Sequence, residues 1–518
     1  MLPRLRLLGQ ILRALWRIGL LSFRPSVPLA FLRAWWRCGS SYACLAEVAA
    51  RRFPERIAVV DDRGGLTFRE LRQQAEALST SLAREPDLRP GDRVGLLARN
   101  HRDLLVALIA LGRLGVDVLL LGTGIPAPAL RRLLAAEAPR LVLHDAEFAA
   151  LLESTRIPRL VLGRALPACP RPLPRTRQAG RIVLLTSGST GTAKRIARRP
   201  TPGSLLPVVA GLVRALPLRM HAPTLAAIPL YHGYGLALSA MALAFGAPLH
   251  LGRRCEIAPL LARLPGDGPP AFLVSIPTLL RRWLRAPDAP CPPLAAVVTG
   301  SAPLSPGLCR RLLDRAGPCV FNLYGSTEAG IIALATPSDL REAPGTVGIP
   351  LLGNQVRVAP ETREIQVRGP MVVTVAKGQW YGTGDLGRLD DHGRLFVCGR
   401  LDGMVVSGGE NVYPFETEAA LLEHPDLADA AVVAVDDPDF GQALLALVAP
   451  APGLALDGNL IRDWLRTRLE PCKLPRNIQV IEAIPRNALG KLDVPALRAL
   501  VATVRPQDRM PTHEVDRG

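Results

Sequence analysis

The segment LLTSGSTGTAKR occupies residues 184–195 and begins within an apolar run, RIVLLTS, at residues 181–187. Such a run predicts a buried strand. The turn after it offers hydroxyl groups and closely approachable backbone amides, which a polyphosphate requires, and Lys194 adds a positive point charge. The segment is not a Walker loop, because the spacing of its glycines differs and Arg195 stands where that loop has Ser or Thr. A turn of this composition is also common in ordinary loops, so its function has to be judged from the rest of the chain.

Short apolar runs alternate with helical patterns around this segment. The helical period occurs at residues 68–84 and 101–115, and strands are predicted at 57–62, 93–98, 117–121, 140–145 and 181–187. Alternation of this kind indicates α/β architecture with largely parallel sheets. Because 518 residues exceed what one hydrophobic core usually holds, we expect two or more domains.

The composition limits the class of protein. The chain is 48% apolar and 21% charged, which is typical of a globular protein. Its nine cysteines are scattered and include no CxxC pair, so we predict reduced thiols in a cytoplasm-like compartment. The net charge of +18 is compatible with nucleic acid, an anionic substrate or a membrane surface, but only 4% of the residues are aromatic and no basic-aromatic stripe occurs. We therefore predict no nucleic-acid partner.

The first 37 residues hold seven arginines and no acid. Several polar residues among them recur at spacings of three, four and seven, which places them on one face of a helix: Arg6, Gln10, Arg13, Arg17 and Arg24. A basic amphipathic helix with aromatic residues is typical of a segment on an anionic membrane, and the stretches between its charges are far shorter than the roughly 20 apolar residues of a span. We predict a cytoplasmic protein with peripheral contact at the inner face of the membrane. The alternatives are a helix docked on its own protein and a cleaved targeting peptide.

Two later segments also place small-residue turns after predicted strands. They are VVTGSAP at residues 297–303 and FNLYGSTEAG at residues 321–330. Ligands in open α/β sheets lie beyond the carboxyl ends of the strands. In such a place Tyr324 can stack on a purine, Thr327 can meet a phosphate oxygen, and the carboxylate of Glu328 can hold magnesium.

The segment WYGTGDLGRLDDHGRLFVCGRLDGMVVSGGENVYP, at residues 380–414, carries Asp385 and Arg400. A carboxylate and a guanidinium group suit the paired hydroxyls of a ribose, because one accepts and the other donates hydrogen bonds. Farther along, PRNALGKL at residues 485–492 contains Lys491, one of only four lysines among 63 basic residues. A lysine retained in a glycine-containing segment is a candidate for contact with a phosphate or carboxylate oxygen.

Together, and in this order, the segments at residues 184–195, 321–330, 380–414 and 485–492 resemble the signature motifs of the adenylate-forming superfamily. That superfamily holds acyl-CoA synthetases, luciferases and the adenylation domains of peptide synthetases. The resemblance implies an α/β fold, with a large N-terminal domain of layered sheets and helices joined by a hinge to a smaller α+β C-terminal domain. We expect a basic N-terminal segment, a large AMP-binding domain, a small C-terminal lid domain and a tail, at residues 1–38, 39–401, 402–505 and 506–518.

The resemblance also implies which residues bind the nucleotide. The phosphate-binding loop would comprise Thr186, Ser187, Gly188, Ser189, Thr190, Gly191 and Lys194. The adenine side of the site would be lined by Gly300, Ser301, Ala302, Pro303, Tyr324 and Gly325. The ribose would be held by Asp385 and Arg400.

Other residues would act in the chemistry. Thr327 would contact the α-phosphate, Glu328 would bind Mg²⁺, and Lys491 would bridge the acyl carboxylate and the α-phosphate. His232, in YHGYGL, resembles the histidine that lines the acyl pocket of acyl-CoA synthetases; a merely packed histidine is the alternative. The hinge would fall at Asp402. The thiol would be faced by Ser407, Gly408, Gly409 and Glu410.

The implied reaction has two steps. A carboxylic acid would be activated by ATP as an acyl-AMP with release of pyrophosphate, and the acyl group would then pass to coenzyme A. The expected cofactors are therefore ATP, Mg²⁺ and coenzyme A. Attack of a carboxylate on ATP brings two anions together, so magnesium and lysine must neutralise charge at the α-phosphate. Because Lys491 would obstruct the thiol, the family rotates its small domain between the steps.

The predicted substrate is a medium-chain or long-chain fatty acid. SGGENVYP, at residues 407–414, resembles the form common in CoA ligases. Glycines near the expected pocket leave room for a chain: Gly233, Gly235, Gly300 and Gly325. Three alternatives stay open, namely transfer of the acyl group to a carrier protein, use of an aryl acid, and a non-catalytic nucleotide-binding protein associated with a membrane.

Overall fold

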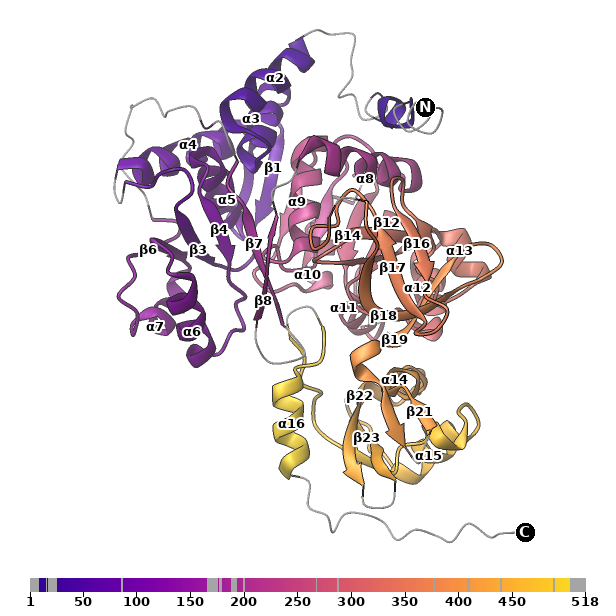
Figure 1. Ribbon diagram of the computed structural model, residues 1–518. Coiled ribbons are helices and arrows are strands. Elements are labelled where there is room, and N and C mark those ends of the chain that lie inside the picture. Colours follow the sequence, from indigo (N-terminus) through magenta and orange to yellow (C-terminus); the bar gives the residue numbers. More distant parts are fainter. Residues whose placement is uncertain are drawn as a thin grey trace, which may run out of the picture.

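The computed structural model describes most of the chain. The described residues are 9–14, 16, 26–84, 87–164, 176, 179–187, 193–198, 201–266, 268–286, 288–376, 378–407, 410–437, 440–487 and 490–503. Figure 1 shows a large upper body that contains the strands up to β19, and a smaller lower body formed by the elements that follow. Within these ranges, no helix is both long enough and apolar enough to cross a membrane.

The first sheet of the large body has six strands and carries the predicted phosphate loop. Its strand order is β6 (Arg159–Val161), β5 (Leu141–His144), β3 (Arg93–Leu97), β4 (Asp117–Leu120), β7 (Ile182–Ser187) and β8 (Ala193–Arg198). All neighbours are parallel except β7 and β8, which form an antiparallel pair. The connecting helices are α5 (Arg102–Leu114), α6 (Ala127–Glu137) and α7 (Ala149–Leu152).

The second sheet has nine strands. Their order is β15 (Ile349–Pro350), β14 (Gly330–Ala335), β13 (Val320–Ser326), β12 (Leu294–Gly300), β11 (Ala271–Ser275), β9 (Thr224–Ala226), β10 (Leu249–Leu251), β1 (Ile57–Asp61) and β2 (Gly64–Thr67). The strands from β13 to β1 are parallel, so the carboxyl ends of β12 and β13 meet at one edge. The helices of this part are α3 (Tyr42–Arg52), α4 (Phe68–Arg84), α8 (Pro202–Ala215), α9 (Gly233–Phe245), α10 (Ile257–Leu261), α11 (Pro277–Leu284), α12 (Pro306–Ala316) and α13 (Pro337–Glu342).

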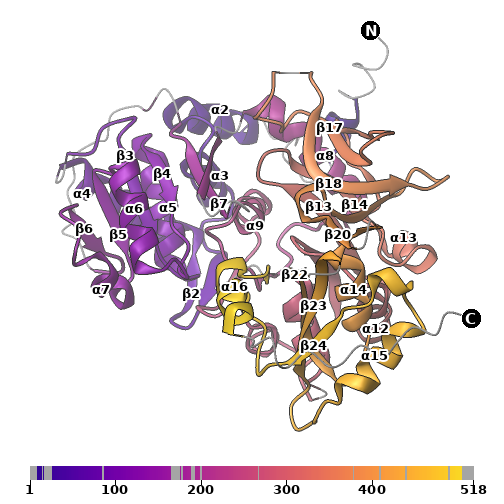
Figure 2. The ribbon, with the colours of Figure 1, turned by 60° about the horizontal axis from the view of Figure 1, so that its bottom comes forward.

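A short 3₁₀ turn, η2 (Leu401–Gly403), connects the third sheet to the fourth along the chain. Before it lies an antiparallel sheet of β16 (Gln355–Val358), β17 (Glu364–Arg368), β18 (Tyr381–Leu389) and β19 (Leu395–Arg400). After it comes a sheet of β20 (Val405–Ser407), β21 (Glu410–Val412), β22 (Leu427–Asp437), β23 (Gly441–Pro450) and β24 (Asn477–Val480). This last sheet forms the small domain with α14 (Pro414–Leu421), α15 (Gly458–Arg466) and α16 (Val494–Thr503), as Figure 2 shows from below.

These elements confirm the predicted α/β class with a large N-terminal and a smaller C-terminal part. The five predicted strands are β1, β3, β4, β5 and β7, and the two predicted helices are α4 and α5; each end agrees to within one residue. Helix α5 is apolar on nearly all sides because it lies between the two parallel sheets, in contact with β1 and β4.

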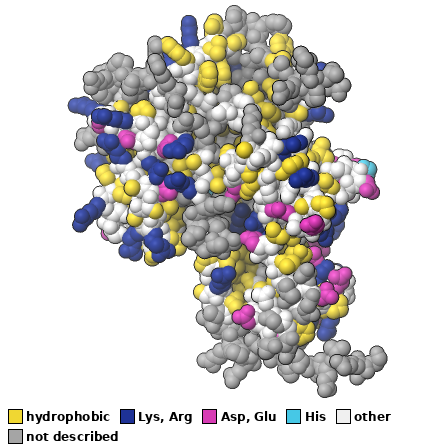
Figure 3. Space-filling model, in the orientation of Figure 1, with side chains coloured by type: hydrophobic (Ala, Val, Ile, Leu, Met, Phe, Trp, Pro, Cys, Tyr) yellow, Lys and Arg dark blue, Asp and Glu magenta, His cyan; other side chains and the backbone are white. Residues whose placement is uncertain are grey.

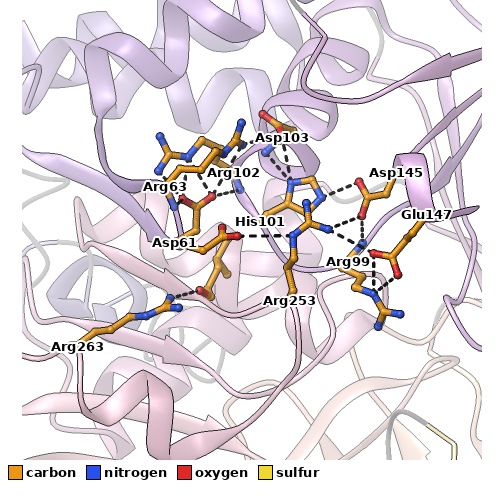
Figure 4. A network of polar contacts seen from close by, with 12 residues as sticks. Asp61, Arg63, Arg99, His101, Arg102, Asp103, Asp145, Glu147, Arg253 and Arg263 are labelled. Atoms are coloured by element: carbon orange, nitrogen blue, oxygen red, sulfur yellow. Dashed lines mark hydrogen bonds and ion pairs between the residues drawn. The ribbon is translucent and has the colours of Figure 1, made fainter.

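A network of charged side chains joins these two sheets at one edge (Figure 4). His101, before α5, has its Nε2 atom 2.7 Å from Oδ1 of Asp145, which follows β5. Arg253, which follows β10, lies 3.6 Å from Asp145 and 3.3 Å from Glu147. Burial alone would lower the pKa of His101, but hydrogen bonds with Asp103 and Asp145 raise it to about 9. The imidazole is therefore a buried cation between carboxylates at neutral pH.

The N-terminal segment contains two helical stretches. Residues 9–14 and 16 are helical, and a second helix, α2 (Ser26–Cys38), packs on α3. Three arginines of the predicted basic face lie outside the described residues: Arg6, Arg17 and Arg24.

Candidate active site

Neighbouring strands of the third sheet carry the residues predicted to hold a ribose. Asp385 of β18 and Arg400 of β19 are opposite each other in the antiparallel register, and Nη1 of Arg400 lies 2.9 Å from Oδ1 of Asp385. The hydroxyl of Tyr324, from β13, donates a hydrogen bond to Oδ2 of Asp385 at 2.6 Å. Burial and the adjacent negative charge raise the pKa of Tyr324 well above its usual value, so it stays a donor at neutral pH. Each carboxylate oxygen of Asp385 thus has a fixed partner.

Arg400 also contacts the predicted hinge residue. Its Nε atom lies 3.0 Å from Oδ1 of Asp402, in η2. Burial alone would lower the pKa of Arg400, but the hydrogen bond with Asp402 and the charge of Asp385 raise it. The sequence assigned Asp402 only to the hinge, whereas the structure ties it to a predicted ribose ligand.

Lys491 lies on a tight loop of the small domain. The backbone N–H of Asn487 donates to the carbonyl of Lys491 at 2.8 Å, and the N–H of Lys491 donates to Oδ1 of Asn487 at 3.1 Å. Gly490 has a φ of +70°, and a Cβ atom there would lie 2.8 Å from both Ile276 and Thr278. Those two residues begin α11 of the large domain, so the loop is seated directly against it.

Arg486 holds this loop to its own domain. Its Nε and Nη2 atoms contact the carboxylate of Asp429, in β22, at 2.7 and 2.8 Å, and its Nη1 donates to the carbonyl of Gly490 at 2.9 Å. A second contact crosses the domain boundary, where the Arg285 guanidinium donates to the carbonyl of Leu427. The position of Lys491 therefore depends on contacts within the small domain and on its docking against the large one.

Five predicted site residues influence one another electrostatically. Burial lowers the pKa of Lys491 and Arg400 lowers it further, while Asp385 and Glu328 act in the opposite direction; Lys491 still keeps an exposed surface. Burial, followed by the positive charge of Lys491, lowers the pKa of His232 to about 4. At neutral pH the imidazole of His232 is therefore neutral.

Thr327 and Glu328 lie in the turn between β13 and β14. The carbonyl of Glu328 accepts a hydrogen bond from the N–H of Val373 at 3.1 Å, which fixes the turn. Burial and the charges of Glu328 and Asp385 raise the pKa of Tyr381 to about 12. The carboxylate of Glu328 is therefore near Asp385, at the same end of the sheets.

The surroundings of Glu328 suit Mg²⁺. In the described part of the chain, no group of three or more His, Cys, Asp or Glu side chains gathers into a metal site. Magnesium is commonly held by one or two carboxylates, with substrate phosphates and water as the other ligands. A single carboxylate beside a nucleotide site fits that pattern.

The predicted adenine turn follows β12. Gly300 is paired with Leu323 of β13, and a Cβ atom at Gly300 would lie 2.7 Å from the Leu323 carbonyl oxygen. Ser301 has a φ of +67°, an unusual value for a residue other than glycine, and strained backbone of this kind clusters at ligand sites. Ala302 and Pro303 follow it in the turn, and Gly325 continues β13 beside Gly330. The close approach of backbones leaves no room for larger residues here.

Two predicted loops are described only at their ends. Thr186 and Ser187 end β7, and Thr186 pairs with Lys194 of β8, so the phosphate-binding segment joins two antiparallel strands. Ser407 pairs with Glu410 between β20 and β21. Six of the predicted residues lie outside the described residues: Gly188, Ser189, Thr190, Gly191, Gly408 and Gly409.

A narrow apolar cavity of about 60 Å³ lies between α8, α9 and the nine-stranded sheet. Three of its lining residues, Tyr234, Val298 and Leu323, stand within two positions of predicted site residues in the sequence. The hydroxyl of Tyr234 donates a hydrogen bond to the carbonyl of Val298 at 3.1 Å. Most other lining residues are apolar: Leu212, Leu216, Leu218, Ala222, Ala237, Leu238, Met241, Ala242, Phe245, Ala247, Phe272, Val274 and Ile331. Such a lining suits the apolar body of a carboxylic acid.

A second cavity, of about 270 Å³, lies between the two domains and is basic. Its charged lining consists of five arginines and one acid: Arg99, Arg253, Arg254, Arg282 and Glu256 of the large domain and Arg486 of the small domain, which also contributes Asn487 and Gly490. Arg99 pairs with Glu147 at 2.8 Å, as part of the network in Figure 4. The structure gives no ion pair with a described residue for Arg254 or Arg282. This cavity can accept a multiply charged anion.

Sequence reasoning missed the residues that position Lys491. Arg486 and Asn487 stand in the same motif as Lys491, so their closeness in the sequence could have indicated that they position the lysine. Asp429 lies 57 positions from Arg486, and nothing in the sequence pattern links the two. Tyr381 and Tyr234 were also missed, although each is next to or within a quoted motif.

Comparisons with known proteins agree with this geometry. The family model of the AMP-binding enzymes matches residues 46–378, and that of the AMP-binding enzyme C-terminal domain matches residues 416–491. Among curated proteins, the 2-succinylbenzoate–CoA ligase of Geobacillus kaustophilus is 32% identical over 480 residues, which covers 86% of this chain and 96% of the relative. A feruloyl-CoA synthase of an Amycolatopsis species is 30% identical over 474 residues, with coverage of 86% and 95%.

Solved structures show the same likeness. The o-succinylbenzoate CoA synthetase of Bacillus subtilis, in complex with its acyl-adenylate intermediate, has a TM-score of 0.77 at 25% identity and covers 89% of this chain and 98% of its own. A structure of that enzyme with ATP and a magnesium ion has a TM-score of 0.75 at 25% identity, with coverage of 86% and 98%. These relatives are named for aryl acids, so they lend no support to the prediction of a fatty acid.

Proposed function

Because the chain belongs to the family of AMP-binding enzymes, we propose that it is an acid-thiol ligase that joins a carboxylic acid to coenzyme A through an acyl-adenylate. The reaction uses ATP, Mg²⁺ and coenzyme A. The observation that carries the proposal is the convergence of Lys491, from the small domain, with Asp385, Arg400 and Glu328 of the large domain. A nucleotide-binding protein without catalysis has no need for this cross-domain lysine.

The residues divide the first step between them. Asp385 and Arg400 orient the ribose, with Tyr324 fixing the carboxylate of Asp385. Lys491 stabilises the negative charge that develops as the carboxylate of the acid approaches the α-phosphate. Bound at Glu328, Mg²⁺ would supply further positive charge at the phosphates. His232 is neutral, so it can accept or donate one hydrogen bond beside the acyl group without adding charge.

The second step requires that Lys491 leave. Its loop is held to the large domain by packing at Ile276 and Thr278, and η2 lies between the two domains. We propose that the small domain rotates about Asp402 and brings the β20–β21 hairpin, with Ser407 and Glu410, toward the thiol. The basic cavity beside the lysine loop suits the phosphates of coenzyme A, because arginine forms bidentate bonds with phosphate.

We propose an acid with an apolar body and no second charged group as the substrate. The apolar cavity lined by Tyr234 offers few polar partners, with Thr224 and the exposed Arg219 among its lining. A second carboxylate buried there would lose its hydration without compensation. This lining favours the alkyl chain of a fatty acid. The names of the relatives favour an aryl acid as the second candidate.

The test is release of pyrophosphate, dependent on ATP and magnesium, across alkyl acids of increasing length and a set of aryl acids, each with and without coenzyme A. We expect release to peak with an alkyl acid and to accelerate with coenzyme A. A peak with an aryl acid would establish the second candidate. Release that ignores coenzyme A would point to a carrier-protein acceptor, and no release with any acid would contradict the proposal.

A variant of the cavity lining tests whether the acyl chain of the substrate enters the apolar cavity. Ala237→Phe narrows the apolar cavity from α9, so we expect turnover of long acids to fall by about tenfold or more while that of a two- or three-carbon acid stays unchanged. The short acid serves as the internal control for folding. Equal loss for short and long acids would show that the acyl chain does not enter this cavity.

A further inference from the structure

We propose that α2, together with the helical residues 9–14 and 16 before it, docks the protein on an anionic lipid surface. Helix α2 buries one face and exposes another that is equally apolar. Ala34 and Cys38 are buried against α3, whereas Leu29 and Leu32 are 50% and 54% exposed. Trp36, one helical turn beyond Leu32, is 60% exposed. The outer side of α2 is therefore apolar and exposed, which is typical of a surface that contacts a membrane or a protein partner.

The preceding helical stretch exposes the same kinds of side chain. Leu12 is 46% and Trp16 50% exposed, so both helical stretches present a leucine and a tryptophan to the outside. Tryptophan favours the boundary between the hydrocarbon and the headgroups of a bilayer, because its ring is apolar and its N–H is polar. Three of the six tryptophans of the chain lie in this region: Trp16, Trp35 and Trp36. The N-terminal segment is therefore richer in tryptophan than the rest of the protein.

The charge around these residues has one sign. The sequence contains no acid before Glu47, and Glu47 is paired with Arg51 at 2.8 Å. Arg33 and Arg37 are exposed on α2. Figure 3 shows hydrophobic and basic side chains along the upper edge of the molecule over α2, and no acidic side chain there. Basic residues that flank an apolar face are complementary to anionic headgroups.

A lipid surface explains this arrangement better than a second copy of the chain. A twofold dimer through α2 would place the same arginines opposite each other without an acid between them. The surface also precedes the part that matches the family model, which starts at residue 46. None of the candidate site residues lies in α2, so this contact serves placement of the enzyme and does not rest on the proposed reaction.

The full-length protein can be tested by flotation with vesicles of phosphatidylcholine alone or with about 30% phosphatidylglycerol. We expect flotation with the anionic vesicles only, loss of it at high salt, and a blue shift of tryptophan emission on binding. The double variant Leu29→Asn/Leu32→Asn should bind at least about tenfold more weakly, because it removes apolar area without changing charge. Leu460→Asn, at an exposed leucine of α15, is the matched control and should bind like the wild type.

A second pair of variants tests the role of charge. Arg33→Gln should weaken binding to anionic vesicles, while Arg132→Gln, at an exposed position of α6, should leave it unchanged. All variants should release pyrophosphate normally in the absence of vesicles, which shows that they are folded. Absence of flotation, or equal flotation with both kinds of vesicle, would overturn the proposal. A concentration-dependent dimer that Leu29→Asn/Leu32→Asn abolishes, without flotation, would identify this face as an interface between copies.

Discussion

The ribose side of the candidate site and the lysine side are built in different ways. Asp385 and Arg400 are neighbours in a strand register, and Tyr324 closes the arrangement from an adjoining sheet. Lys491 reaches the same place from the other domain, on a loop held by Arg486. The first arrangement is fixed by folding of the large domain alone. The second exists only while the domains are docked, so the two sides can be separated in experiments on the half-reactions.

The largest expected effect comes from Lys491→Ala. It removes the ammonium group that stabilises charge at the α-phosphate, so we expect adenylate formation to fall by about 10²–10³-fold, as for other electrostatic stabilisers. Conversion of supplied acyl-adenylate to acyl-CoA should stay nearly unchanged. The two rates are measured separately, as pyrophosphate release and as thioester formation.

Lys473→Ala is the matched control for this prediction. Lys473 lies on the same domain and pairs with Glu416 and Glu470 at 2.7 and 3.0 Å, so its removal should leave both half-reactions intact. Equal loss of both half-reactions in Lys491→Ala would show that the two sides of the site cannot be separated.

Asp385→Asn should reduce the rate by a smaller factor than Lys491→Ala, but it should slow both half-reactions. The amide cannot accept from Tyr324 and Arg400 as the carboxylate does, so the ribose loses its orientation. We expect both half-reactions to slow by about 10- to 100-fold, because the adenylate must be held in each. Asp390→Asn changes a carboxylate at the far end of the same two strands, where it pairs with Arg394, and should leave the rates unchanged. A loss confined to the first half-reaction would contradict the assignment of Asp385.

Gly490→Ala tests the docking of the lysine loop. The substitution adds a methyl group where Ile276 and Thr278 leave no space, at a φ of +70°. We expect pyrophosphate release to fall by about tenfold, with thioester formation from the adenylate spared. Gly393→Ala has a φ of +73° and nothing within 4 Å of its new Cβ atom, so it carries the same backbone strain without the contact. Similar kinetics for the two variants would rule out a role for loop seating.

The smallest effect on catalysis is expected for His101→Gln, which lies in the network of Figure 4. The pKa of His101 is about 9 in the folded protein, above the value of about 6.5 expected when unfolded. The stabilisation from its charge is therefore full below pH 6.5 and is lost as the pH rises through 9. We expect the wild type to lose about 1–3 kcal/mol of unfolding free energy over this range and the variant to lose less.

Urea titrations at several pH values measure this difference, and His392→Gln, at an exposed histidine, serves as the control. Both half-reactions should proceed at wild-type rates in His101→Gln near neutral pH. An unchanged pH dependence of stability in His101→Gln would show that the imidazole carries no charge in the fold.

The sequence predicted the parallel sheets well because buried strands such as β3 and β4 are short continuous apolar runs, and α4 and α5 have a clear helical period. Asp385, Arg400, Glu328 and Lys491 were also predicted, since each stands in a glycine-containing motif. Long-range partners were not, because a pair such as Arg486 and Asp429 depends on the register of β22. The aryl names of the relatives likewise differ from the fatty acid inferred from glycines. Gly235, Gly300 and Gly325 lie directly against backbone carbonyl oxygens, so their small size reflects close backbone packing and does not indicate an open pocket.

Helix α3 links the N-terminal surface to the apolar cavity. The hydroxyl of Tyr42 in α3 donates to the carbonyl of Leu236 in α9 at 2.6 Å and lies 2.9 Å from the hydroxyl of Ser239. Helix α9 lines this cavity, so α2, α3 and α9 form a continuous stack from the outer surface to the cavity. Figure 1 shows the small domain at the opposite end of the molecule from α2. If α2 contacts a membrane, the apolar cavity would therefore lie at a fixed distance from the bilayer, and the small domain would face the solvent on the opposite side, where nothing restricts its rotation.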